Sequence, residues 1–123
     1  MKLHSSVPSG VNTITGYGEG YVMVNGERRS SSVVVLPDRI EEWPAKRFDQ
    51  LSTEDFTYLK NLKAEIVLLG TGPRQRFPHP RLTAELAKAG IGLEVMDLQA
   101  ACRTYNILMS EGRRVAAALL IEA

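Results

Sequence analysis

The chain has very little of the chemistry on which redox, metal-binding and disulfide-stabilised proteins depend. Its 123 residues include one cysteine and two histidines. With Cys102 alone, no intramolecular disulfide can form. Neither a C-x-x-C nor an H-x-x-x-H spacing is present in the sequence. We therefore expect no bound metal and no cofactor.

Long apolar runs and an excess of one charge are also missing. The longest apolar run, Val115 to Ile121, is far shorter than the ~20 residues that span a bilayer. The formal net charge is +1, so the chain has no overall attraction to nucleic acid, and we expect no nucleic-acid partner. The opening MKLHSSVPSG lacks the apolar core of a signal peptide, which favours a cytoplasmic location and leaves peripheral membrane association open.

What the sequence does contain is an N-terminal β region followed by alternating strand and helix patterns. Asn25-Gly26 is a hairpin signal, and Ser30 to Leu36 is typical of a strand. We expect this region to form an antiparallel unit that adds strands to the main sheet. The later apolar runs at 66–69, 93–96 and 115–121 are separated by segments of helical length. They predict three adjacent strands of one sheet, the first two parallel.

Helix signals lie between these apolar runs. Ser52 is a good N-cap, with Asp55 placed for a weak capping box. Pro80 suits the first turn of a second helix, which Gly90 would end. Asp97 can cap a third helix that extends to about residue 110.

The segment GTGPRQR at residues 70–76 follows a strand that we expect to be central, where open α/β sheets bind ligands. Its glycines allow close backbone approach, its threonine offers a hydroxyl, and its two arginines can hold an anion. It matches neither a dinucleotide fingerprint nor a Walker loop. Two interpretations stay open: a tight turn with solvated arginines, or a site for a small anion or a protein partner. The candidate binding residues in this loop are Gly70, Thr71, Gly72, Arg74 and Arg76.

The helix after Asp97 presents an apolar face and a polar stripe. Residues spaced by three and four form the stripe: Gln99, Arg103, Asn106 and Ser110. We take Arg103 and Asn106 as further binding residues and expect them to border one shallow concave surface with the 70–76 loop. Cys102 lies on the apolar face and is expected to be buried and unreactive, because the sequence positions no base beside it. We assign no catalytic residue.

Five segments carry a family resemblance. They are Ser31–Val34, Glu65–Gly72, Gly92–Asp97, Ala100–Leu108 and Glu111–Leu119. The most specific is AACRTYNIL at Ala100–Leu108. Together they resemble a small family of unknown function, the Mth938-like α/β domains, whose mitochondrial relatives include a complex I assembly factor.

The resemblance implies a layered α/β domain without an established enzymatic activity. In mitochondrial members the implied role is to assist assembly of respiratory complex I at the inner membrane. The resemblance also implies that bacterial members are cytoplasmic and that some are linked to protein-export genes, and this chain looks bacterial. Pattern and resemblance together predict a single three-layer α/β domain over residues 11–123, preceded by a flexible arm at residues 1–10. The predicted domain has a mixed central β-sheet, a parallel C-terminal βαβαβ core and an N-terminal antiparallel β unit.

Two functions follow from these observations. The first is a non-catalytic, assembly-factor-like domain that binds a protein partner and assists membrane-complex assembly or protein export. The alternative is a small-molecule or anion-binding enzyme that uses the Gly70–Arg76 loop, with Cys102 or Asn106 in the chemistry. The absence of a positioned acid–base pair favours the non-catalytic function.

Overall fold

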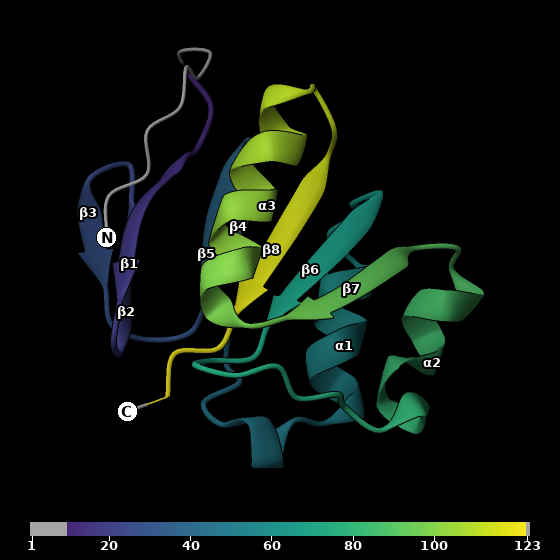
Figure 1. Ribbon diagram of the computed structural model, residues 1–123. Helices are drawn as coiled ribbons and strands as arrows, with labels where there is room; N and C mark the ends of the chain where they lie inside the picture. The colour runs from purple at the N-terminus through teal and green to yellow at the C-terminus, as the bar shows by residue number, and fades with distance from the viewer. Residues whose placement is uncertain (1–9, 123) are drawn as a thin grey trace.

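The computed structural model describes residues 10–122, and its centre is a mixed sheet with the strand order β5-β4-β8-β6-β7 (Figure 1). β6 pairs in parallel with β7 and with β8, whereas β4 pairs antiparallel with β8 and with β5. The strands of this sheet are β4 (Val33–Leu36), β5 (Arg39–Glu42), β6 (Ile66–Gly70), β7 (Gly92–Met96) and β8 (Val115–Leu119). The prediction of three adjacent C-terminal strands, the first two parallel, is confirmed, with β6 between its two neighbours.

The N-terminal β region divides between two sheets. Its first part is a separate antiparallel sheet of β1 (Ile14–Gly18), β2 (Tyr21–Val24) and β3 (Glu27–Arg29). Asn25 and Gly26 connect β2 to β3 with φ values of 53° and 81°, as a two-residue hairpin turn requires. β4 and β5 join the central sheet instead. All of β4 is buried, as expected for a strand covered on both faces. The predicted antiparallel unit and its added strands are confirmed; of the predicted arm, only Gly10 falls within the described residues.

The helices begin at the predicted caps. The Ser52 side chain and the Asp55 side chain form a capping box at the start of α1, Pro80 opens α2, and the Asp97 carboxylate caps α3. The helical segments are η1 (Phe48–Gln50), α1 (Thr53–Lys60), α2 (Pro80–Lys88) and α3 (Leu98–Ser110). Within residues 10–122, none of these helices is long and apolar enough to cross a membrane.

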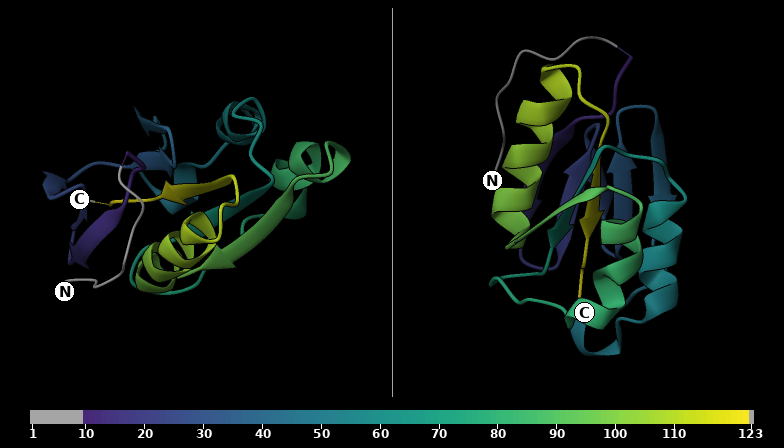
Figure 2. Two further views of the ribbon diagram at one scale, coloured as in Figure 1. Left: turned by 90° about the horizontal axis from the view of Figure 1, so that it is seen from above. Right: turned by 90° about the vertical axis from the view of Figure 1, so that its right-hand side faces the viewer.

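The central sheet is the middle of three layers. Alternate residues of a strand point to opposite faces, so β4 sends Val34 and Leu36 toward α1 and α2, and Val33 and Val35 toward α3 and the small sheet. Figure 2 shows α1 and α3 on opposite sides of the sheet. The predicted three-layer α/β architecture is therefore confirmed.

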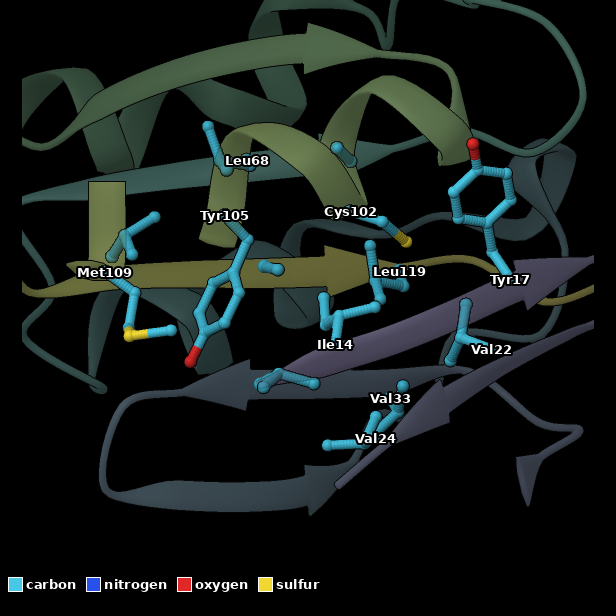
Figure 3. Close-up of a cluster of buried hydrophobic side chains, with 14 of the residues drawn as sticks. Ile14, Tyr17, Val22, Val24, Val33, Leu68, Cys102, Tyr105, Met109 and Leu119 are labelled. Atoms are coloured by element: carbon cyan, nitrogen blue, oxygen red, sulfur yellow. The ribbon is translucent and has the colours of Figure 1, made fainter. Parts of the chain in front are cut away.

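The inner side of α3 lies at the centre of one core. Cys102, Tyr105 and Met109 point from α3 toward Ile14 of the small sheet and Leu119 of the central sheet (Figure 3). The Cys102 side chain is 0% exposed, and burial, with a smaller contribution from the charge of Asp97, raises the pKa of its thiol to about 12. The predicted burial of this cysteine is confirmed.

This environment predicts a thiol that does not react in the folded protein, because the thiolate is the reactive species. Labelling with a maleimide near pH 7 should be at least about a hundredfold slower for the native protein than for the protein in denaturant. Native labelling at the rate of a free thiol would contradict the burial.

Candidate functional site

The carboxyl ends of β6, β7 and β8 meet at one edge of the central sheet, which we call the carboxyl edge (Figure 1). The loop after β6, the start of α3 and the segment 120–122 after β8 all leave this edge. Backbone hydrogen bonds join them: the Leu98 N–H donates to the Gly72 carbonyl (2.8 Å), and the Leu120 N–H donates to the Gly70 carbonyl (2.9 Å). The loop and the start of α3 are thus neighbours, as the sheet topology predicted.

The first residues of the loop hold its shape. A Cβ atom on Gly70 would lie 3.1 Å from the side chains of Ala101 and Leu119, so the glycine lets α3 pack closely on the sheet. Thr71 is fully buried, and its hydroxyl donates to the Arg74 carbonyl (2.7 Å) and accepts the Arg76 N–H (3.0 Å). The Gly70 carbonyl and the Thr71 hydroxyl therefore both have hydrogen-bond partners within the protein.

The two arginines of the loop differ in their surroundings. The Arg76 guanidinium donates to the Thr71 carbonyl and to Glu122 Oε1 (2.9 Å), and it lies 4.7 Å from the centre of the Phe48 ring. Arg74 is exposed and has no ion pair among residues 10–122. An anion at this loop would meet one free guanidinium rather than the expected two.

Glu122, in the segment after β8, holds the loop in place through hydrogen bonds. Its Oε2 accepts the Phe48 N–H (2.6 Å) while its Oε1 accepts from Arg76. Burial alone would raise the pKa of this carboxyl, but the hydrogen bonds from Phe48 and Arg76 outweigh it and lower the pKa. The carboxylate therefore ties the loop to η1 in its charged form.

Asn106 does not belong to an exposed polar stripe, contrary to the expectation from helical spacing. Its side chain is 5% exposed. Its Nδ2 donates to the Ile14 carbonyl (2.7 Å), and its Oδ1 accepts the Ile14 N–H (3.0 Å). The adjacent Tyr105 hydroxyl donates to the Asn12 carbonyl (2.8 Å). Both side chains thus join α3 to the first sheet.

The exposed face of α3 follows a different line, through Gln99, Arg103 and Ile107. We call this the α3 face. Gln99 borders a cleft of about 410 Å³ together with Gly72 and Pro73 of the loop. Arg103 lies one turn further along the same face, outside that cleft, and Ile107 beyond it is 58% exposed. The loop and the start of α3 do share one hollow, but Arg103 and Asn106 do not line it.

A larger cleft of about 680 Å³ was missed by the sequence reasoning. It lies between the link from β3 to β4, at Ser30–Ser32, and the segment Trp43–Arg47 after β5. The signals that could have indicated it are a polar serine run before an apolar strand and the only tryptophan, which comes three and four residues before Lys46 and Arg47. Neither identifies a cleft without knowledge of how β4 pairs with β5.

The described residues offer no cluster of metal-ligating side chains. Across residues 10–122, no group of three or more His, Cys, Asp or Glu side chains could hold a metal ion. His79 caps α2, where its Nδ1 accepts the Arg81 N–H (3.1 Å), and His4 lies outside the described residues.

Comparisons with known proteins find relatives in sequence and in structure. A family model described as "Protein of unknown function (DUF498/DUF598)" matches residues 14–120. The chain is 38% identical over 99 residues to the NADH dehydrogenase [ubiquinone] 1 alpha subcomplex assembly factor 3 of Danio rerio. That match covers 79% of this chain but only 57% of the fish protein.

Solved structures extend the comparison to the fold. A crystal structure of a Bordetella parapertussis protein has a TM-score of 0.87 and 42% identity, and the match covers 94% of this chain and all of that one. The solution structure of a Bordetella pertussis Mth938-like domain has a TM-score of 0.80 and 34% identity, with coverage of 100% and 94%. The resemblance to Mth938-like domains read from the sequence is confirmed.

Replacing Asn106 should separate the small sheet from α3. Asn106→Ala leaves the N–H and C=O of Ile14 buried without partners, which should lower the free energy of unfolding by about 2–4 kcal/mol. Arg103→Ala, on the exposed side of the same helix, should change it by no more than about 0.5 kcal/mol. Equal urea midpoints for the two variants would contradict the structural role of Asn106.

Glu122 should make stability depend on pH. Because its pKa is lower in the folded than in the unfolded chain, its contribution is present above the usual glutamate pKa of about 4.3 and is lost as pH falls through the folded value. The difference in unfolding free energy between the wild type and Glu122→Gln should therefore shrink as pH is lowered from 7 to 3. Glu111→Gln, at the end of α3, controls for the change in net charge. If the difference in unfolding free energy between the wild type and Glu122→Gln is constant with pH, Glu122 does not hold the loop in its charged form.

Proposed function

We propose that this chain, which belongs to the DUF498/DUF598 family of proteins of unknown function, is a non-catalytic, assembly-factor-like domain. The observation that carries the proposal is the 38% identity over 99 residues to a protein named as an NADH dehydrogenase assembly factor. Since the chain spans 57% of that relative's length, the partner and the complex are part of the proposal. The partner is a protein subunit that this domain holds before it joins a multi-subunit complex, with respiratory NADH dehydrogenase as the first candidate.

The α3 face is the proposed contact surface. Arginine is one of the side chains that supply much of the binding energy at protein interfaces. This face combines exposed Arg103 with Ile107, which is 58% exposed. A buried leucine or isoleucine side chain contributes roughly 1.5–3 kcal/mol relative to an exposed one. Nothing in the described fold covers Ile107, so a partner would supply that burial.

The Gly70–Arg76 loop supports one end of the proposed surface. Arg74 is its exposed charge, and Pro73 shares a cleft with Gln99 of the α3 face. Hydrogen bonds of the other loop residues hold its shape and its position against α3; these residues are Gly70, Thr71, Gly72 and Arg76. The proposed site of action is the cytoplasm, with contact to a membrane only through a membrane-bound partner.

Gene deletion with complementation tests this function. Loss of the gene should lower the amount of assembled NADH dehydrogenase on native gels, and the wild-type gene should restore it. Arg103→Glu/Ile107→Asp should weaken partner binding by about tenfold or more and fail to restore assembly. Arg81→Glu, exposed on α2 on the other side of the sheet, is the matched control.

The outcomes separate the function from its surface. Normal assembly after deletion would overturn the assembly proposal for this complex. Full restoration by the double variant would keep the function and remove the α3 face from it. Circular dichroism of both variants establishes that they are folded.

A further inference from the structure

The outer strands of a sheet can bind another strand, because their backbone N–H and C=O groups lack a neighbour on one side. Residues 10–122 have four outer strands: β1 and β3 in the small sheet, and β5 and β7 in the central sheet (Figure 1). Asn106 already pairs with β1. All three residues of β3 and three of the four in β5 are charged, which discourages pairing. β7 (GLEVM) carries one charge in five residues, so it is the edge most open to another strand.

The free backbone groups of β7 follow from its pairing with β6. The Gly92 N–H donates to the carbonyl of Glu65, the residue before β6 (3.2 Å). Alternate residues of a strand direct their backbone groups to opposite sides, so those of Leu93 and Val95 point away from β6. Gln75 Nε2 donates to the Val95 carbonyl (2.8 Å). Among residues 10–122, the Leu93 N–H, the Leu93 carbonyl and the Val95 N–H have no hydrogen-bond partner.

We propose that β7 pairs with β7 of a second copy of this chain, antiparallel and centred on Leu93, so that the two central sheets join into one. This register sets Leu93 against its own copy and Ile91 against Val95, whose free N–H then meets the Ile91 carbonyl. The other two groups of that pair already have partners. The Ile91 N–H donates to the Leu86 carbonyl (3.0 Å), and the Val95 carbonyl accepts from Gln75 (2.8 Å). This match between free and occupied groups favours a second copy over an unrelated strand.

The side chains of β7 fit the same register. Ile91, Leu93 and Val95 pack on the core beneath α2, and each is only half-buried. In the pair, Leu93 lies beside Leu93 and Ile91 beside Val95, and apolar pairs across strands stabilise a sheet. On the other face, exposed Glu94 falls opposite Gly92, which has no side chain. A pairing centred on Glu94 would instead oppose two carboxylates, which is destabilising.

The contact is small. A strand of five residues is about 17 Å long, and an interface of this length is at the lower end of specific interfaces. We therefore expect a reversible dimer with a Kd on the order of 100 µM. The contact uses no residue of the α3 face and does not depend on the proposed assembly function.

Sedimentation and hydrogen exchange test the dimer without any substitution. Between about 10 µM and 1 mM, the average mass should rise from 13.6 kDa toward twice that value. Over the same range the exchange of the Leu93 and Val95 amides should slow about fourfold, while the Glu94 amide, which faces β6, should not change. A chain that is still monomeric at the highest concentration, or that associates with the Leu93 and Val95 amides unprotected, would overturn the proposal.

Gly92 offers a matched pair of variants that tests the register. A Cβ atom there would lie 3.6 Å from the nearest atom of a residue outside its chain neighbours, an ordinary contact. Gly92→Lys sets an ammonium against Glu94 of the second copy and should tighten the dimer about fivefold, because the two-fold axis makes two such pairs. Gly92→Glu opposes two carboxylates and should weaken it about as much.

Gln50→Lys and Gln50→Glu, exposed at the end of η1, make the same changes in net charge and should leave the Kd within about twofold. Opposite effects of the two Gly92 variants support the register. Effects of the same sign, or effects no larger than those of the Gln50 variants, would overturn it.

Discussion

One side-chain amide satisfies the free edge of the N-terminal sheet where it meets α3, and the packing of that sheet relies on it. β1 is an outer strand of its sheet, and the N–H and C=O of Ile14 face α3 instead of another strand. Asn106 offers one donor and one acceptor, so it satisfies both groups as a neighbouring strand would. Tyr105 closes the next position through Asn12. With this edge satisfied, Ile14 can enter the core without unpaired backbone groups beside it.

The carboxyl edge of the central sheet is organised by the short segment after β8. Ile121 lines the large cleft and also a further cleft of about 330 Å³ that Gly20 and Gly72 border, so this segment separates the two. Glu122 fixes the segment through Arg76 and the Phe48 N–H. The large cleft and the α3 face thus lie on one scaffold with separate linings.

Most of the fold could be predicted from local signals. Apolar runs marked β6, β7 and β8, and the Ser52 and Asp97 caps marked two helices, because strands and helix ends are determined largely by residues close in sequence. The candidate site was harder to predict. Helical spacing put Asn106 with Arg103, but α3 packs on two sheets, and the contact that buries Asn106 comes from a residue 92 positions away. The pairing of Ser32 with Trp43 likewise depends on a strand register that composition does not reveal.

The position of β8 has a consequence for synthesis on the ribosome. It is the last strand of residues 10–122, yet it lies between β4 and β6. Until it emerges, the β4–β5 hairpin and the parallel pair of β6 and β7 have no strand between them. About 80 residues separate β4 from β8, so at roughly 5–20 residues per second the apolar β4 waits on the order of 4–16 s for its partner. The central sheet of this domain therefore closes only after β8 has been synthesised, and a nascent chain stalled before residue 115 exposes the surfaces that the finished sheet buries.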